Sequence, residues 1–316
     1  MAMLLPALGL LVGLAILTFA AELFVVGAVR TAARLQMSPV VIGAVVIGIG
    51  TSAPEIVVSG FAAAGGNLEI AVGNIVGSNL ANVSLVLGAA ALVATLTVQS
   101  STLRREAPLS IVSVLLFAVL VQGGLTRLEG VVLMVALVAT VTWLVVSARR
   151  EGNDTLEGEV EEFVGEEEVR LGWELGRALV GLVGTVGAAQ LLVTSALSIA
   201  STLGLGEGFV GLTIVAVGTS LPELATSLQA TRKDETDLVI GNLLGSNIFN
   251  SLAVGGVAAL LGPGIIDDVS LTVTAVLLMV AVVLVAGLFM LTGRRVSRRE
   301  GVILLVAWMA MIPLTV

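Results

Sequence analysis

The chain has 316 residues, of which 57% are hydrophobic and only 12% are charged, and its mean hydropathy is +1.10. Soluble domains carry about a quarter charged residues, so this composition excludes a soluble protein and indicates a chain that crosses a membrane several times. The net charge is −8, and cysteine and histidine are both absent. Disulfides, thiolate or imidazole metal ligands and a histidine proton relay are thereby excluded. Any bound metal ion must be held by oxygen.

Apolar stretches long enough to cross the membrane occur ten times, since about 20 helical residues span roughly 30 Å of hydrocarbon. The first stretch lacks a basic leader and a clear cleavage site, so we expect a retained span rather than a signal peptide. The predicted fold class is therefore an all-α polytopic membrane protein with ten transmembrane helices. The predicted spans cover residues 4–29, 38–64, 69–98, 107–124, 128–148, 172–202, 208–230, 237–262, 270–292 and 301–316.

The basic residues support this count and give an orientation. With ten spans, all but one of the 15 lysines and arginines fall on one side of the membrane, and Arg127 alone falls on the other. Loops rich in lysine and arginine face the cytoplasm. We therefore predict a multi-pass protein of the cell membrane with both termini outside.

One long polar stretch divides the chain. Residues 151–168 carry nine acidic residues without the Asp-x-Asp-x-Asp-Gly pattern of a calcium loop, which favours a solvated cytoplasmic linker over a calcium sensor. We predict a first five-helix repeat over residues 1–150, an acidic linker over 151–171 and a second five-helix repeat over 172–316.

Two motifs recur at a constant offset of 168 residues. Gly-Thr-Ser-x-Pro-Glu occupies residues 50–55 and 218–223, and Gly-Asn-x-x-Gly-Ser-Asn-x-x-Asn occupies residues 73–82 and 241–250. Close packing of membrane helices favours small residues, but it requires neither Pro-Glu nor paired asparagines. Five spans per copy is an odd number, so the second copy enters the membrane upside down. Inverted repeats are typical of transporters whose site lies where the two copies meet.

Each copy places one glutamate, Glu55 or Glu223, within strongly apolar sequence. An ionised side chain at the bilayer centre costs roughly 2.5 to 3.5 kcal/mol, so an acid there is predicted to be functional. A purely structural, hydrogen-bonded role is the alternative, and it is less favoured for a repeated pair. Pro54 and Pro222 disrupt their helices and free backbone carbonyls, which predicts broken helices in spans two and seven.

The oxygen atoms of the motifs suit a hard cation. Residues four positions apart share one helix face. Two bidentate glutamates and two threonine carbonyls supply about six oxygens, which suits Ca²⁺ better than the strictly octahedral Mg²⁺. Two Na⁺ ions would neutralise the same two carboxylates, and this competition is a physical basis for exchange. The four-residue pairs are Thr51 and Glu55, Thr219 and Glu223, Ser78 and Asn82, and Ser246 and Asn250.

The remaining motif residues have simpler interpretations. The glycines at 50, 73, 77, 218, 241 and 245 are expected to permit close helix approach. Asn74, Asn79, Asn242 and Asn247 are candidates either for ion binding or for cross-linking helices, and the sequence leaves both roles open.

The paired motifs resemble the two alpha repeats of the sodium/calcium exchanger family within the calcium/cation antiporter superfamily, in its minimal prokaryotic ten-helix form. This resemblance covers nearly the whole chain. It implies alternating access, exchange of Na⁺ for Ca²⁺ with Ca²⁺ export, and two sodium-binding backbone carbonyls at Gly48 and Ala216. The implied site residues are Glu55, Glu223, Thr51, Thr219, Ser52, Ser220, Ser78, Ser246, Asn82, Asn250, Gly48 and Ala216.

Asn250 departs from one branch of that family. Some archaeal exchangers and the potassium-dependent branch resemble this chain but have aspartate at this position, so Asn250 argues against a potassium requirement. The site keeps a fixed charge of −2, which one Ca²⁺ neutralises and three Na⁺ would overcompensate. Binding of three sodium ions is left open.

Three functions fit paired intramembrane acids: Na⁺/Ca²⁺ antiport, Ca²⁺/H⁺ antiport through the same glutamates, and a passive cation channel. The lack of histidine argues mildly against protons, and channels usually assemble from several subunits whereas one chain encloses this site. No nucleophile and base pair or phosphate loop is visible, so we expect a transporter and no enzyme. We expect Ca²⁺ and Na⁺ as substrates, the lipid bilayer as surroundings, no nucleic-acid partner and no resident cofactor; a monomer suffices for the site.

Overall fold

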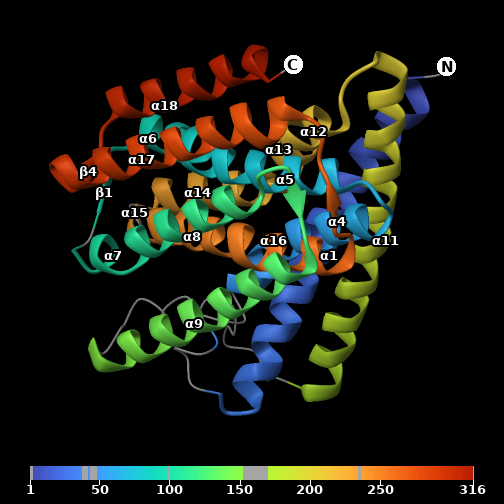
Figure 1. Ribbon diagram of the computed structural model, residues 1–316. Coiled ribbons are helices and arrows are strands. Elements are labelled where there is room, and N and C mark those ends of the chain that lie inside the picture. Colours follow the sequence, from blue (N-terminus) through green and yellow to red (C-terminus); the bar gives the residue numbers. More distant parts are fainter. Residues whose placement is uncertain are drawn as a thin grey trace.

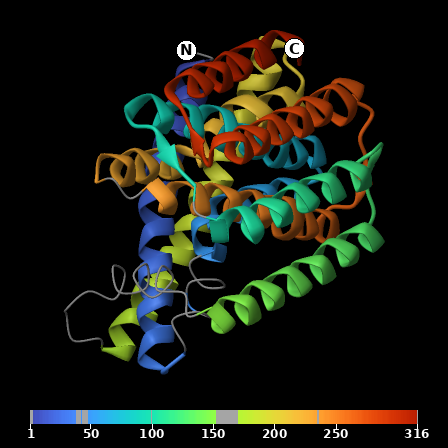
Figure 2. The same ribbon diagram turned by 90° about the vertical axis from the view of Figure 1, so that its left-hand side faces the viewer.

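A computed structural model describes residues 3–37, 42, 48–98, 100–151, 170–233 and 236–315. Nearly all of the described residues are helical (Figures 1 and 2), which confirms the predicted all-α class. The predicted 151–171 linker lies almost entirely outside the described residues.

The first half contains α1 (Leu4–Arg34), α3 (Gly48–Thr51), α4 (Ala53–Ala64), α5 (Leu68–Ala81), the π-helix η2 (Asn82–Val86), α6 (Leu87–Val93), β1 (Leu96–Thr97), α7 (Ser100–Arg104), α8 (Glu106–Leu120), β2 (Gly124–Leu125) and α9 (Arg127–Glu151). The second half contains α11 (Leu171–Leu203), α12 (Glu207–Val210), the π-helix η3 (Gly211–Val215), α13 (Ala216–Thr219), α14 (Leu221–Arg232), α15 (Thr236–Phe249), the π-helix η4 (Asn250–Val254), α16 (Gly255–Leu261), β3 (Gly264–Ile265), the π-helix η5 (Ser270–Ala275), α17 (Val276–Gly293), β4 (Arg295–Val296), α18 (Arg298–Met311) and the 3-10 helix η6 (Ile312–Leu314).

The two halves repeat the same succession of elements. α4, α5, η2 and α6 begin at residues 53, 68, 82 and 87, and α14, α15, η4 and α16 begin at residues 221, 236, 250 and 255. The offset between each pair equals the 168-residue offset of the sequence motifs. The duplicated sequence is therefore a duplicated structure.

Equivalent helices of the two halves run in opposite directions. Gly13 of α1 lies against Leu192 of α11, and Gly27 lies against Ala178, so these two long helices are antiparallel. β1 pairs with β4 and β2 pairs with β3, both antiparallel. Because α8 runs from β1 to β2 while α17 runs from β3 to β4, these helices also run oppositely. Inversion of the halves relative to the bilayer stays a prediction.

Among the described residues, six helices are long and apolar enough to cross a membrane by length and composition, and the bent pair from Glu207 to Arg232 forms a seventh candidate crossing. All seven match predicted spans. The other three predicted spans contain the shorter helices α4, α8 and α18, and residues 38–41 and 43–47 of the second span lie outside the described residues. The count of ten crossings stays a prediction.

The duplicated asparagine motifs lie on the most buried helices. In the most apolar 18-residue windows of the stretches 68–93 and 238–261, 83% of the residues are buried, whereas the corresponding shares in α1 and α9 are 22% and 17%. In Figures 1 and 2, α1 and α11 stand along one side of the bundle, and α5 and α15 lie within it. The outer helices therefore present apolar side chains to lipid, and the motifs are kept from it.

Close helix approach explains two of the motif glycines. A Cβ atom on Gly73 would overlap the carbonyl oxygen of Gly208, and one on Gly77 would overlap the carbonyl oxygen of Leu212. α5 therefore packs backbone to backbone on α12 and η3, as expected for small residues between membrane helices.

The variant Gly77→Ala should lower the free energy of unfolding by about 1 to 3 kcal/mol, because the added methyl group overpacks this contact. Gly187→Ala is the matched control, since Gly187 is exposed on α11 and no described atom lies within 4 Å of its Cβ position. Alanine favours helix over glycine, so the control should unfold at the parental temperature or slightly above. Thermal unfolding of purified protein in detergent measures both, and equal unfolding temperatures for the two variants would contradict the packing account.

Candidate cation site

Two helix breaks place the glutamates at the start of α4 and α14. Ser52 separates α3 from α4 with φ −88° and ψ 8°, and Ser220 separates α13 from α14 with φ −88° and ψ 5°. Proline follows in the first turn of both helices, where its missing N–H leaves no helical hydrogen bond unmade. The break at Ser220 bends the chain by 42°. The predicted interruptions are both present.

The breaks change the geometry expected for threonine and glutamate. Thr51 ends α3 while Glu55 lies in α4, and Thr219 ends α13 while Glu223 lies in α14. The expected sharing of one helix face across four residues therefore does not hold for these pairs. Non-helical backbone at the intervening serine brings each threonine and glutamate to the same break instead.

Both glutamates are buried with unsatisfied oxygen atoms. Glu55 is 1% exposed and Glu223 is 3% exposed, and their charges lie close enough to interact. Neither carboxylate oxygen of Glu55, nor Oε2 of Glu223, accepts a hydrogen bond of good geometry within the described chain, although the Thr219 hydroxyl lies close to the Glu55 carboxylate. An ionised carboxylate is strongly destabilised by such burial, so this pair must be neutralised by bound cations or by protons.

Further unpartnered oxygen atoms belong to the same four motif segments. Buried polar groups are nearly always hydrogen-bonded, so a concentration of exceptions needs a cause. Oxygen lone pairs without facing donors are the ligands that Ca²⁺ and Na⁺ accept. The buried side-chain oxygens in question, without a partner among the described residues, are Ser52 Oγ, Ser220 Oγ, Ser78 Oγ, Ser246 Oγ, Asn79 Oδ1, Asn82 Oδ1 and Asn250 Oδ1.

Contacts between elements bring these atoms together across the halves. α4 packs on α5 and on η4, whereas α14 packs on α15 and on η2. Each glutamate helix therefore contacts the π-helix of the other half. Asn82 and Asn250 are the first residues of those π-helices, and π-bulges frequently occur at functional sites. Sequence patterns gave no indication of these bulges.

One predicted backbone ligand, the Ala216 carbonyl, already accepts a hydrogen bond. Ala216 is fully buried, and its carbonyl accepts the Ser220 N–H at 3.0 Å. The same carbonyl lies 3.2 Å from Thr219 Oγ1, whose single hydrogen is shared with a second acceptor, Asn74 Oδ1. The other predicted backbone ligand, Gly48, is the first residue of α3. The two threonines differ in burial, since Thr51 is half-buried and its counterpart Thr219 is only 1% exposed.

Asn74 and Ser59 join the halves close to the site. Thr219 Oγ1 donates to Asn74 Oδ1 at 3.2 Å, and Asn74 Nδ2 donates to Ser59 Oγ at 2.9 Å. Asn74 and Ser59 have no exposed surface. Asn74 therefore cross-links helices, one of the two roles that the sequence left open. Ser59 was missed because it lies outside the motifs, although its counterpart Ser227 preserves the 168-residue offset.

The described residues show no equivalent contact between Asn242 and Ser227. Asn242, the counterpart of Asn74, is half-buried, and Ser227 Oγ has no hydrogen-bond partner in the described chain. The two repeats therefore have the same polar residues at these positions, but the residues differ in burial and in hydrogen bonding. Among the described residues, Asn74 is bonded to Ser59, and no equivalent bond joins Asn242 to Ser227.

Clusters of three or more Asp, Glu, Cys or His ligands that could hold a metal ion are not found among the described residues. The fixed charge available to a cation at the candidate site is thus that of Glu55 and Glu223.

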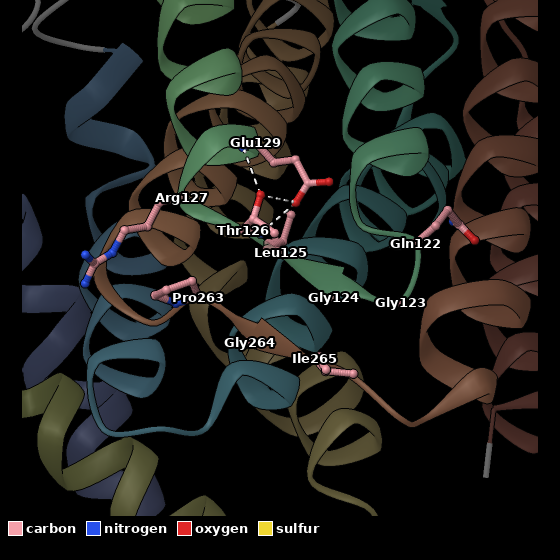
Figure 3. A pocket seen from close by; sticks show the side chains of 10 residues that line it. All are labelled: Gln122, Gly123, Gly124, Leu125, Thr126, Arg127, Glu129, Pro263, Gly264 and Ile265. Atoms are coloured by element: carbon pink, nitrogen blue, oxygen red, sulfur yellow. Dashed lines mark hydrogen bonds between the residues drawn. The ribbon is translucent and has the colours of Figure 1, made fainter.

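A pocket of about 360 Å³ lies at the turn between β2 and α9 and is distinct from the candidate site (Figure 3). Glu129 Oε2 there accepts the Thr126 N–H at 2.6 Å and Thr126 Oγ1 at 2.9 Å, so it caps the start of α9. None of the predicted site residues lines this pocket. The hydrogen bonds between Glu129 and Thr126 in this pocket are explained by capping of the α9 helix.

The fold defines a multi-pass membrane protein. The sequence matches the family described as sodium/calcium exchanger protein over residues 5–146 and 173–315. Sodium/calcium exchanger MaX1 of Methanosarcina acetivorans is 30% identical over 95% of each chain, and inner membrane protein YrbG of Escherichia coli K12 is 37% identical over 98% of this chain and 97% of that one. The sodium-calcium exchanger NCX_Mj, solved after soaking with Na⁺ and Sr²⁺, superposes with a TM-score of 0.65, 29% identity and 98% coverage of both chains.

The chain belongs to the sodium/calcium exchanger family. The resemblance expected from its motifs is thereby confirmed. It is a membrane cation antiporter of that family, and the ions, their coupling and their ligands follow as proposals.

Replacing Asn74 tests the cross-link between the halves. Asn74→Leu removes the partners of two buried hydroxyl groups at similar side-chain volume, so the free energy of unfolding should fall by about 1 to 3 kcal/mol. Asn242→Leu, at the half-buried counterpart, should cost less than half as much. Thermal unfolding in detergent compares the two variants. Equal losses would show that the hydrogen-bonded chain through Asn74 does not distinguish the halves.

Proposed function

We propose that this protein is a secondary antiporter that exchanges Na⁺ for Ca²⁺ and exports Ca²⁺ from the cell. The observation that carries the proposal is the buried pair Glu55 and Glu223, lying between the halves with unpartnered oxygen atoms around it. Membership of the sodium/calcium exchanger family supports the same ions.

The charge of the pair explains why the two ions would compete. Two carboxylates carry −2, which one Ca²⁺ or two Na⁺ neutralises completely. Ca²⁺ accepts six to eight oxygen ligands at about 2.3 to 2.6 Å, and buried hydroxyl and amide oxygens extend the set beyond the carboxylates. Since both occupants need the same charges, binding of one expels the other, and an inward Na⁺ gradient can drive Ca²⁺ outward.

The proposed ligands are those expected from the motifs. The glutamates supply the charge, and the serine and asparagine oxygens complete the coordination shells. Backbone carbonyls take part once their internal hydrogen bonds open, as the engaged Ala216 carbonyl requires. The proposed set is Glu55, Glu223, Ser52, Ser220, Ser78, Ser246, Asn82 and Asn250, with the carbonyls of Thr51, Thr219, Gly48 and Ala216.

Unequal hydrogen bonding of the two halves supports alternating access. Asn74 bonds to Thr219 and Ser59, whereas the described residues of the other half show no equivalent bond between Asn242 and Ser227. An exchange of these two states between the repeats would open the site first to one side and then to the other. With both termini outside and the acidic linker in the cytoplasm, one of those openings faces the cell interior.

Ca²⁺ flux into proteoliposomes tests the coupling ion. Sodium-loaded vesicles placed in sodium-free buffer should accumulate Ca²⁺ against its gradient, and replacing all sodium by choline should abolish uptake. Uptake that persists in choline and follows an imposed pH gradient would instead establish Ca²⁺/H⁺ antiport through the same glutamates. Downhill flux alone, indifferent to both gradients, would identify a channel.

Removing one of the paired charges should stop transport. Glu55→Gln or Glu223→Gln reduces the fixed charge to −1 and removes a bidentate ligand, so sodium-driven Ca²⁺ uptake should fall to the level of empty vesicles. Glu22→Gln, on an exposed position of α1, should retain parental uptake. Unfolding in detergent monitors folding of all three variants. Near-parental flux in both Glu55→Gln and Glu223→Gln would show that the pair is not the transport site.

A further inference from the structure

A chain of amide groups crosses between the halves behind Asn82. Asn82 Nδ2 donates to Asn247 Oδ1 at 3.1 Å, and Asn247 Nδ2 donates to the backbone oxygen of Asn79 at 3.4 Å. Asn82 is 1% exposed, and Asn79 and Asn247 have no exposed surface. Water therefore does not compete for these bonds, and the three residues set each other's orientation.

The chain of bonds has a direction. An asparagine amide has a donor end and an acceptor end, whereas a backbone carbonyl only accepts. Asn247 must therefore turn its NH₂ group toward the Asn79 carbonyl and its oxygen toward Asn82. Asn82 must in turn present its NH₂ group to Asn247, so its own Oδ1 points away from Asn247. That oxygen has no hydrogen-bond partner within the described ranges.

The direction matters at a cation site. An amide binds a cation only through its oxygen, and a reversed amide would present the positive end of its dipole to the ion. Asn82 begins η2, which packs on the helix that carries Glu223. Ser78 lies one turn earlier, and its Oγ is likewise unpartnered in the described chain.

We propose that Asn247 is a positioning residue that holds the oxygen of Asn82, rather than its NH₂ group, toward the transported cation. This inference rests on the proposed function, because it assigns a role within the same site. Asn247 itself does not touch the ion. It acts from the opposite repeat, so the two halves must be in contact for Asn82 to be oriented.

The inference also predicts an inequality between the repeats. By symmetry, Asn79 should orient Asn250 as Asn247 orients Asn82. Asn79 Nδ2 instead donates to Ser251 Oγ at 3.1 Å and contacts Met279 Sδ at 3.6 Å. Ser251 has no counterpart in the first half, where residue 83 is valine. The described residues consequently show no bond between Asn79 and the Asn250 side chain. Among them, Asn82 alone of the two is oriented by such a chain of amide hydrogen bonds, which we call the amide relay.

A double-mutant cycle tests the positioning role. Asn247→Leu removes the acceptor at similar volume, so the apparent KM for Ca²⁺ in sodium-driven uptake should rise by about tenfold, the effect of one lost orienting hydrogen bond. In an Asn82→Asp background, both carboxylate oxygens are equivalent and no orientation is needed. There, adding Asn247→Leu should change the KM of Asn82→Asp by less than about twofold.

A purely structural Asn247 gives a different pattern. Loss of packing would raise the KM or lower the maximal rate equally in both backgrounds, and equal shifts therefore overturn the proposal, as does an unchanged KM in the parental background. Should Asn247→Leu fail to fold, Asn247→Ala is used in the same cycle, with the same two outcomes. Unfolding temperatures of the four proteins establish that each is folded.

Direct binding separates this inference from the proposed function. Calorimetric titration of the four purified proteins with CaCl₂ in detergent measures the relay without requiring transport. If the parent does not couple Ca²⁺ uptake to sodium, the proposed function fails, and the relay is then judged by the Ca²⁺ dissociation constants alone. The proposal is supported if Asn247→Leu raises the Kd for Ca²⁺ about tenfold in the parental protein, which has Asn82, but not in the Asn82→Asp variant. Any other pattern overturns it.

Discussion

The structure depends on one electrostatic constraint: two carboxylates are held close together in an interior that supplies few donors to them. Glu55 and Glu223 are almost completely buried, and most of their oxygens accept no hydrogen bond within the described chain. Like charges in a poorly solvated interior repel strongly, so the pair must be neutralised by bound cations or by protons.

Other features of the fold follow from placing the pair at that position. The breaks at Ser52 and Ser220 turn each glutamate into the first turn of a new helix, and the π-helices begin at the asparagines of the opposite half. Because equivalent helices pack antiparallel, the glutamate helix of each half meets the π-helix of the other half. The repeats nevertheless differ in their supporting bonds, because Asn74 and Asn242 have different surroundings and because Ser251 replaces a valine. Residue types are duplicated, but the networks that hold them are not.

Much of this organisation could be predicted from sequence, because hydropathy and a constant offset are properties of the chain alone. The all-α class, the broken helices and the glycine contacts at Gly73 and Gly77 were anticipated in this way. The π-helices and the amide relay through Asn247 were not, since a bulge and the direction of a hydrogen bond depend on tertiary contacts. The expected single-helix geometry of threonine and glutamate was wrong, because the proline break falls between them. Ser59 was overlooked although its repeat in Ser227 was visible.

Competition between sodium and calcium for binding to the purified protein tests the central claim most directly. The protein is titrated calorimetrically with CaCl₂ at increasing NaCl concentrations, with ionic strength held constant by choline chloride. We expect one high-affinity Ca²⁺-binding site, and its apparent Kd for Ca²⁺ should rise with at least the second power of the sodium concentration. That dependence is expected if Ca²⁺ and two or more Na⁺ neutralise the same pair of glutamates. A Ca²⁺ affinity that is indifferent to sodium would contradict the account.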